Sequence, residues 1–288
     1  MDGIIIINKE ENWTSNDVVQ KVKHIFKEKV GHTGTLDPLA TGVLPILIGK
    51  GTLLSKYLIN HDKEYIATIK LGIKTDTGDS EGKELERREV EREMIEKNNV
   101  SNVLKSFIGK QSQIPPMYSA IKVNGKKLYE YARKGQTIEV TSRNIEIYNI
   151  ELISINNKEN EIIYKVNCSK GTYIRTLSED IAKAIGTIGY MKNLLRTKVG
   201  DFEIEHSIKV SELEEKKDYF DNFIITIESF FYNKTNLVLN KNQIYRFLNG
   251  TKVKIEKKNE LYRIYNEYNQ FIGVGEIRDG SLKREIVM

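Results

Sequence analysis

The segment that constrains this chain most is the polar loop at residues 31–42, GHTGTLDPLATG, because it lies between two apolar stretches. Residues 3–8 predict a buried strand before it, and residues 43–48 form a second apolar run after it. Three glycines open backbone conformations that are closed to other residues, and Pro38 fixes the backbone just after Asp37. Asp37 is therefore presented at a defined position. Residue type and spacing alone leave it open whether this carboxylate is a nucleophile, a general base, a metal ligand or a turn-capping side chain.

The first half of the chain mixes predicted helices and strands. Apolar residues follow a helical period from Val18 to Phe26, and Thr14 or Ser15 caps that helix. Residues 52–59 predict a second helix, and the alternation over residues 64–71 predicts a half-buried strand. The charged residues 84–107 predict a helix with a break near Asn98 and Asn99.

The second half continues this mixture and then changes. Residues 143–154 and 161–168 predict strands, followed by a turn at Gly171, a short extended piece that carries Arg175, and a helix that ends at Gly186. From about residue 234 the pattern changes to short strands with turns, which predicts a small β-rich domain. Without regular βαβ spacing, the whole favours an α+β fold in which helices flank a mixed sheet.

Composition excludes several classes of protein. At about 150 residues per domain, 288 residues correspond to two domains. No apolar run approaches the roughly 20 residues that span a bilayer, and the apolar run at residues 4–7 is too short for a signal peptide. We therefore expect a cytoplasmic protein without a membrane partner. The single cysteine, Cys168, and four scattered histidines form neither a disulfide nor a zinc spacing, so we expect no metal and no cofactor.

Positive charge is concentrated in two regions. Residues 234–288 contain 11 Lys and Arg against 6 Asp and Glu, whereas the first 233 residues are balanced at 34 of each sign. Residues 105–143 contain eight basic and two acidic residues, with Tyr118, Tyr129 and Tyr131 among them. Cations displace phosphate counterions and aromatic rings stack on unpaired bases. Either region alone is equally well explained as a solvated surface, but the two together favour an RNA or DNA partner.

One competing motif is set aside. Asp76-Thr77-Gly78 is the triplet of aspartic proteases, but it occurs once and the residues before it lack the apolar flank that buries such a loop. The stretches at residues 76–82 and 42–51 fit neither a calcium loop nor a phosphate-binding loop, and both are interpreted as turns.

Several segments carry a family resemblance. The run GHTGTLDPLATGVLPILIG resembles the catalytic motif of the bacterial TruB family, the tRNA pseudouridine-55 synthases. KEYIATIKLGIKTDTGDSEG is similar to the family's tyrosine-containing strand, QIPPMYSAIKVNGKKLYEYARKG to its RNA-gripping insertion and CSKGTYIRTLSEDIA to its arginine-containing motif. The segment LLRTKVGDF follows in the family's order, so the resemblance covers about residues 3–205. The tail resembles more loosely the PUA-like RNA-binding domain of these enzymes.

The resemblance implies a pseudouridine-synthase-like catalytic domain at residues 1–230, with the insertion at about 105–143, and a PUA-like domain at 231–288. It also implies a cofactor-free isomerisation, in which the uracil of a T-loop uridine in tRNA is flipped out, detached from C1′ and rejoined through C5. Asp37 matches the nucleophile, Arg175 the cation that pairs with it, and Tyr65 the ring that stacks on the target base and is placed to move a proton. Attack on the sugar, attack on the base and deprotonation at C2′ all remain open for Asp37.

The resemblance also implies substrate contacts. His32 matches a residue that enters the T loop as a wedge or stacking partner, and Tyr173 and Leu194 match substrate-contacting positions. The segment MKNLLRT departs from the family's commoner paired arginines and retains Arg196 and Lys198, which puts fine contacts there in doubt. The insertion supplies four candidate phosphate contacts: Lys122, Lys126, Lys127 and Arg133.

Two other functions compete with this enzyme. One is a tRNA-binding folding factor that keeps the synthase scaffold without its chemistry, and the presence of Asp37, Tyr65 and Arg175 argues against it. The other is a guide-RNA-directed relative within a ribonucleoprotein, which the lack of basic extensions and the presence of the insertion disfavour. We therefore expect the tRNA T arm as the partner and no required protein partner. A combined role in catalysis and tRNA folding is compatible with the sequence.

Overall fold

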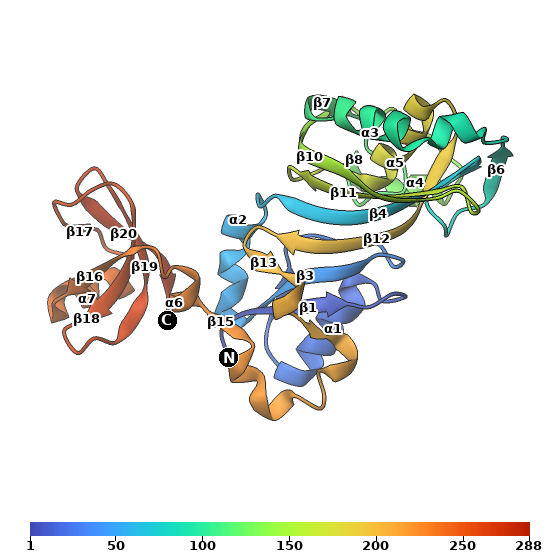
Figure 1. Cartoon of the computed structure of the whole chain (residues 1–288). Coiled ribbons are helices and arrows are strands. Elements are labelled where there is room, and N and C mark those ends of the chain that lie inside the picture. The colour runs from blue at the N-terminus through green and yellow to red at the C-terminus, as the bar shows by residue number, and fades with distance from the viewer.

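The central structure is a mixed sheet that runs through most of the molecule (Figure 1). It was obtained as a computed structural model, which describes residues 1–288 except the side chains of Lys217 and Asp218. The sheet consists, in spatial order, of β14 (Ile208–Lys209), β1 (Gly3–Lys9), β3 (Thr41–Ile48), β12 (Gly189–Val199), β4 (Lys63–Leu71), β11 (Glu161–Cys168), β10 (Arg143–Asn156) and β7 (Gly109–Gln113). Three short strands join it at the side: β2 (Val30–His32) on β3, β13 (Phe202–Glu203) on β12 and β15 (Ile224–Thr226) on β1.

The first helix confirms the sequence prediction. α1 (Ser15–Phe26) begins with a capping box in which the Thr14 side chain accepts from the Asp17 backbone and the Asp17 carboxylate accepts from Thr14. Val18 and Val22 are fully buried, as the helical period requires. The helix predicted over residues 52–59 is instead a 3₁₀ segment, Gly49–Leu54, followed by the short α2 (Ser55–Leu58).

The helix predicted over residues 84–107 is wrong in its first half. Residues 84–87 form β6 (Glu84–Arg87), which pairs with β5 (Ile73–Thr75), and a 3₁₀ turn follows at Arg92–Ile95. β6 is exposed along its whole length, so it carries no apolar alternation that reveals a strand. The helix itself, α3 (Lys97–Ser106), contains Asn98 and Asn99 in its first turn, where a break was predicted.

The extended piece predicted around Arg175 is also wrong, because this residue lies in the first turn of α5 (Ile174–Ile185). Leu177, Ile181 and Ile185 follow at helical spacing and are buried. The helix ends at Gly186 with a φ of 106°, as predicted. α3 and α5 cover the same face of the sheet (Figure 1).

The insertion predicted at about residues 105–143 leaves the sheet between β7 and β10. Gln113 and Arg143 face each other across this strand pair, so the chain leaves and re-enters the sheet at adjacent positions. Between them lie β8 (Lys122–Val123), β9 (Lys126–Lys127) and α4 (Leu128–Ala132). The last two residues of α3, 105 and 106, and the strand β7 belong to the main body rather than to the insertion.

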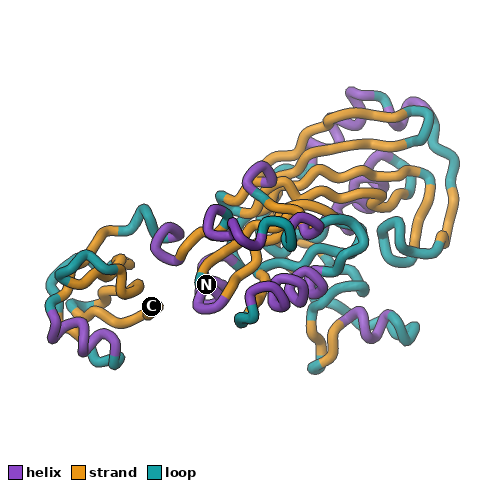
Figure 2. Tube along the Cα trace, turned by 90° about the horizontal axis from the view of Figure 1, so that it is seen from below, coloured by secondary structure: helices purple, strands orange, loops and turns teal.

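The C-terminal residues form a second sheet, which lies apart from the central one at one end of the molecule (Figure 2). Its strands are β16 (Thr235–Leu239), β18 (Leu261–Asn266), β19 (Phe271–Arg278), β20 (Ser281–Val287) and β17 (Val253–Lys254). α7 (Lys241–Leu248), which the sequence reading did not anticipate, covers it and buries Phe247. Val274 and Ile286 pack with Leu54 and Leu58 of the main body, next to α6 (Ile227–Phe230).

Among the residues that the structure describes, no helix combines the length and the apolar character needed to cross a membrane.

Candidate active site

A cavity of about 850 Å³ gathers most of the predicted site residues. Its walls come from the loop before β3, from β4 and β12, from the insertion and from the start of α5. Six of the predicted residues line it: Asp37, Tyr65, Lys122, Tyr173, Arg175 and Leu194. Four predicted residues are outside the lining: His32, Lys126, Lys127 and Arg133.

The backbone on both sides of Asp37 is pinned to the start of the chain. The Ser15 hydroxyl, which is 2% exposed at the start of α1, accepts from Leu36 N–H at 2.8 Å and donates to the Leu36 carbonyl at 3.1 Å. On the other side, the Asn12 N–H donates to the Pro38 carbonyl at 3.0 Å. The carboxylate is therefore carried by a loop with little freedom to move, which favours catalysis by a preorganised group.

Lys9 supports the same loop from inside the protein. Its side chain is fully buried, and its ammonium donates to the carbonyls of Trp13 at 2.6 Å and Pro38 at 3.1 Å. Burial lowers the pKa of Lys9 to about 8, although the nearby Asp37 carboxylate opposes that shift. The ammonium thus contributes a positive charge behind Asp37 while holding the loop.

Arg196 is a second buried cation that holds the loop. Its guanidinium donates to the Val43 carbonyl at 2.7 Å and to the Gly34 carbonyl at 3.1 Å. Its backbone lies so close to Gly42, which has a φ of 103°, that a Cβ there would lie 2.2 Å from the Arg196 carbonyl. The close approach of β12 to the end of the loop therefore requires glycine at this position.

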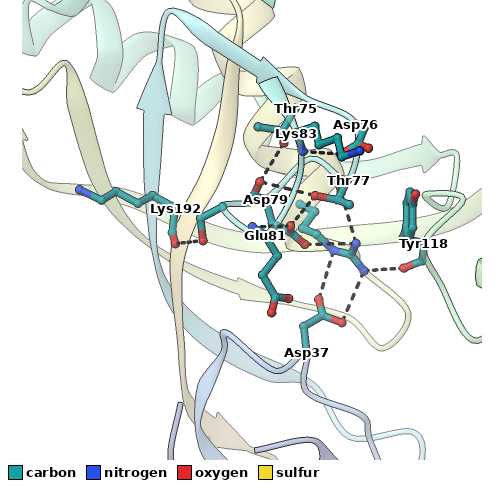
Figure 3. Close-up of polar contacts among 11 residues, drawn as sticks. Asp37, Thr75, Asp76, Thr77, Asp79, Glu81, Lys83, Tyr118 and Lys192 are labelled. Atoms are coloured by element: carbon teal, nitrogen blue, oxygen red, sulfur yellow. Dashed lines mark hydrogen bonds and ion pairs between the residues drawn. The ribbon is translucent and has the colours of Figure 1, made fainter. Parts of the chain in front are cut away.

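Asp37 and Arg175 face each other in the cavity (Figure 3). Arg175 Nε lies 3.1 Å from Asp37 Oδ2, and Nη2 lies 3.5 Å from Oδ1. The Arg175 side chain is 7% exposed, whereas 34% of the Asp37 side chain remains accessible from the cavity. The carboxylate is thus paired on its protein side and open towards the cavity.

The protonation of Asp37 is balanced between opposing effects. Loss of solvent raises its pKa above the ordinary value, and Asp79 raises it further, while Arg175 and Lys9 lower it. A nucleophilic or basic carboxylate must be ionised, so the two cations favour the reactive form in a site whose burial opposes it.

Arg175 is itself fixed by three further contacts. Its Nη1 lies 3.4 Å from Asp79 Oδ2 and donates to the Thr77 carbonyl at 3.3 Å, and its Nη2 donates to the Tyr118 carbonyl at 2.7 Å. Figure 3 shows Asp37, Thr77, Asp79 and Tyr118 gathered around these contacts. The guanidinium therefore joins the loop of Asp37, the turn after β5 and the insertion.

Tyr65 lies on β4 directly across from Arg196 of β12. Its ring is 8% exposed and lines the cavity. Burial raises the pKa of the Tyr65 hydroxyl, and the Arg196 guanidinium beside it counteracts part of that rise. A neutral hydroxyl with a cation next to it is able to give up and regain a proton during a reaction.

Tyr173 and Leu194 complete the apolar walls. Tyr173 is the N-cap residue of α5, and burial raises the pKa of its hydroxyl. Leu194 lies opposite Ala67 on β4 and is 7% exposed. Together with Tyr65, they give the cavity aromatic rings and a leucine side chain, a lining suited to a flat base.

His32 lies outside the cavity lining, at the end of β2. It is half-buried, and its Nδ1 has no hydrogen-bond partner among the described residues. Burial lowers its pKa, and Arg196 lowers it further, so the ring is neutral at physiological pH. This fits the predicted role as a wedge or stacking group rather than an acid.

The predicted phosphate contacts in the insertion surround one tyrosine. The Lys127 ammonium and the Arg133 guanidinium each lie 5.3 Å from the centre of the Tyr129 ring, which lines the cavity. Lys122 and Lys126 are exposed on the two short paired strands. Of these four cations, Lys122 lines the cavity itself, and Lys127 and Arg133 lie around a tyrosine that lines it.

Sequence reasoning missed the residues that hold the site together. Lys9 and Asp79 were given no role in the site, Ser15 was considered only as a helix cap, and Arg196 was noted only as present. Each is a polar side chain that the fold buries, and each has a partner far away in the sequence, as Arg196 has in Val43. Within the described residues, no group of three or more His, Cys, Asp or Glu side chains is arranged to hold a metal ion.

Three family models together match most of the chain. Residues 23–174 match the TruB family pseudouridylate synthase (N terminal domain), and residues 175–231 match the tRNA pseudouridylate synthase B C-terminal domain. Residues 235–286 match the model described as pseudouridine synthase II TruB, C-terminal.

Individual relatives align over nearly the whole chain. The chain is 43% identical over 290 residues to the tRNA pseudouridine synthase B of Clostridium kluyveri, with 98% of both chains covered. It is 44% identical over 283 residues to the protein of the same name from Clostridium tetani, with 96% of each covered.

Solved structures share the fold at lower identity. The chain superposes on the crystal structure of a Cbf5-Nop10-Gar1 complex with a TM-score of 0.67 and 24% identity, covering 99% of this chain and 84% of that chain. An H/ACA RNP bound to a substrate RNA containing 2′-deoxyuridine gives the same TM-score at 22% identity, with the same coverage. The predicted mixed sheet flanked by helices, with a small β-rich C-terminal part, is confirmed.

Proposed function

The chain belongs to the TruB family of pseudouridine synthases, and on this premise we propose that it isomerises the uridine at position 55 in the T loop of tRNA to pseudouridine. Relatives that align over nearly the whole chain are named tRNA pseudouridine synthase B. The observation that carries the proposal is the pairing of Asp37 with Arg175 at the inner wall of a cavity large enough for a flipped nucleotide.

Asp37 begins the chemistry. Attack on the sugar, attack on the base and removal of the C2′ proton all need an ionised carboxylate held next to the nucleotide. Arg175 and Lys9 favour that ionised form, and the pinned loop holds it in place. The uracil then leaves C1′, turns while still in the cavity and rejoins the ribose through C5, so that no atom is lost and no cofactor is consumed.

The cavity walls bind the flipped base. The Tyr65 ring stacks on the uracil, and its hydroxyl moves the proton that the new carbon–carbon linkage releases from C5. Tyr173 and Leu194 enclose the nucleotide. Flipping costs a few kcal/mol of lost stacking, which these contacts offset inside the site. His32 occupies the space that the uridine leaves in the T loop.

The rest of the chain binds the folded T arm. Residues 1–230 form the catalytic domain, and residues 231–288 form a PUA-like RNA-binding domain. Lys122, Lys126, Lys127 and Arg133 of the insertion contact the RNA backbone, so recognition depends on the shape and the phosphates of the arm. The enzyme acts in the cytoplasm and needs no protein partner.

The test is incubation of the purified chain, without nucleotide, guide RNA or partner protein, with unmodified tRNA and with a T-arm hairpin. Pseudouridine-specific mapping is expected to detect conversion at the single T-loop uridine. Asp37→Asn is expected to abolish conversion and leave RNA affinity largely intact. Tight binding by the wild-type chain without conversion of either RNA would identify the folding factor instead.

A further inference from the structure

The side chain of Gln113, the last residue of β7, binds both backbone polar groups of Tyr173. Its Oε1 accepts from the Tyr173 N–H at 2.8 Å, and its Nε2 donates to the Tyr173 carbonyl at 3.1 Å. Gln113 is 5% exposed, so water does not replace these bonds readily. The side-chain amide of Gln113 thus satisfies both the donor and the acceptor of one backbone residue, as a hydrogen-bonded residue of a neighbouring strand would.

Tyr173 is the N-cap residue of α5, where the first backbone N–H groups lack partners within the helix. Its carbonyl also accepts the first helical bond, from the Leu177 N–H at 3.0 Å. The Tyr173 side chain makes no cap hydrogen bond, and the amide of Gln113 binds the backbone of this N-cap residue from outside the helix. Gln113 therefore fixes the point in space at which α5 begins.

Arg175 follows two residues later and depends on that point. The first turn of α5 sets the origin of its side chain, from which Nε reaches Asp37 at 3.1 Å. A displacement of the turn by a fraction of this distance breaks the pairing, because a hydrogen bond weakens steeply beyond its normal length.

Gln113 is also the point at which the insertion leaves the sheet, opposite Arg143. The same excursion contributes the Tyr118 carbonyl, which accepts from Arg175 Nη2 at 2.7 Å. The insertion is thus attached to the start of α5 at two points, one on the backbone of Tyr173 and one on the guanidinium of Arg175.

We propose that Gln113 is a positioning residue for the isomerisation, which fixes the Arg175 guanidinium against Asp37 and joins it to the base of the RNA-contacting insertion. This inference rests on the proposed function. Gln113 does not touch the reacting nucleotide, and it acts through the first turn of α5.

We expect the role of Gln113 to change the pH dependence of the reaction. Without Gln113, the Arg175 guanidinium is no longer held against Asp37. Its charge then lowers the pKa of Asp37 less, so the carboxylate becomes ionised only at higher pH. Other groups also face Asp37, and a substitution at position 113 replaces none of their side chains: Lys9, Tyr65, Asp79, Glu81 and Tyr173.

The experiment compares Gln113→Met with Gln111→Met in the full chain. Gln111 lies on the same strand, but its amide donates to the Phe107 carbonyl, away from α5. The measurements are the single-turnover rate of pseudouridine formation against pH, the Kd for tRNA and the melting temperature. Gln113→Met is expected to slow the plateau rate on the order of 10- to 100-fold and to move the acidic midpoint to higher pH, with Kd changed less than about threefold. Gln111→Met is expected to match the wild type.

A second variant, Gln113→Glu, keeps the acceptor for the Tyr173 N–H and loses the donor to its carbonyl, so we expect a rate between those of Gln113→Met and the wild type. It also serves if Gln113→Met fails to fold. A wild-type rate and midpoint in the folded Gln113 variants would overturn the inference. So would a rate loss that follows the folded fraction while the midpoint stays in place.

The failure of the proposed function has a different signature. If wild-type protein forms no pseudouridine, or if Asp37→Asn retains activity, the assigned reaction or nucleophile is wrong. If the wild type is active and Asp37→Asn is inactive, but Gln113→Met behaves as wild type, only the role of Gln113 fails.

Discussion

Asp79 Oδ2 lies 3.4 Å from Nη1 of Arg175, on a different nitrogen from the one that pairs with Asp37. One buried guanidinium therefore serves two carboxylates, and only the one on the cavity side is a candidate nucleophile. Asp79 is 3% exposed and also accepts from the Thr77 hydroxyl at 2.5 Å, so its position is fixed by the turn that carries it. Asp79 therefore acts on Asp37 in two ways, because it raises the pKa of Asp37 and also holds the Arg175 guanidinium.

Replacement of Asp79 by Asn is expected to move the acidic midpoint of the pH–rate profile to lower pH. Asp79 raises the pKa of Asp37, so removal of its charge favours ionised Asp37. The plateau rate is expected to fall about tenfold, because Arg175 loses an anchor. Single-turnover rates across pH test this, and a midpoint that moves upward would contradict it.

Arg175→Met is expected to shift the midpoint in the opposite direction. It removes the opposite charge that lowers the pKa of Asp37, so the carboxylate is protonated at pH values where the wild type is ionised. We expect a plateau rate lower by on the order of 100-fold, as for the loss of one preorganised electrostatic contact. Arg175→Lys retains the charge but not the forked donors, so its midpoint is expected to lie closer to the wild type. Equal midpoints in both variants would show that charge is not the cause.

The burial of Lys9 predicts that the free energy of unfolding changes with pH in the alkaline range. Its pKa falls from 10.5 in the unfolded chain to about 8 in the folded protein, so between these values the unfolded state binds the extra proton. Stability conferred through this group therefore rises with pH from about 8 towards 10.5. In denaturant titrations, the wild type is expected to gain free energy of unfolding relative to Lys9→Met across that range. Lys23→Met, an exposed change on α1, serves as the control and is expected to run parallel to the wild type.

Gly42→Ala is expected to destabilise the protein by about 3 kcal/mol or more, because the new Cβ meets the Arg196 backbone and the φ of 103° disfavours any side chain. Gly31 lies in the same loop region, and a Cβ there meets no atom within 4 Å. Gly31→Ala is therefore the matched control, with an expected change below about 1 kcal/mol. Chemical denaturation of both variants measures the difference, and similar losses would contradict the assigned packing.

Local signals explain what the sequence predicted correctly. The strand before α1, the helix cap at Thr14 or Ser15 and the C-terminal glycine of α5 each depend on neighbouring residues, and all three are found, with Thr14 as the cap. The loop around Asp37 was recognisable because glycine and proline restrict the backbone directly. The family resemblance supplied the pairing with Arg175, for which the spacing of residues offers no signal.

The wrong secondary-structure predictions fall on segments whose structure depends on tertiary contacts. Arg175 lies in a stretch of β-branched and aromatic residues that resembles a strand, but its burial against the sheet and the bonds from Gln113 set the start of a helix. β6 is exposed along its whole length and contains a single apolar residue, Leu85, so its pairing with β5 leaves no periodic trace in the sequence. The roles of Lys9 and Arg196 also leave no local signal, because they depend on contacts with Pro38 and Val43, which lie 29 and 153 residues away in the chain.

The contact between Lys9 and the Trp13 carbonyl has a practical consequence. Trp13 is the single tryptophan of the chain, and its side chain packs against the main core beside the loop that carries Asp37. The native protein thus contains its own fluorophore next to the catalytic loop. Intrinsic emission, recorded without labels during rapid mixing with RNA, is therefore expected to report changes in the surroundings of Trp13 as RNA binds.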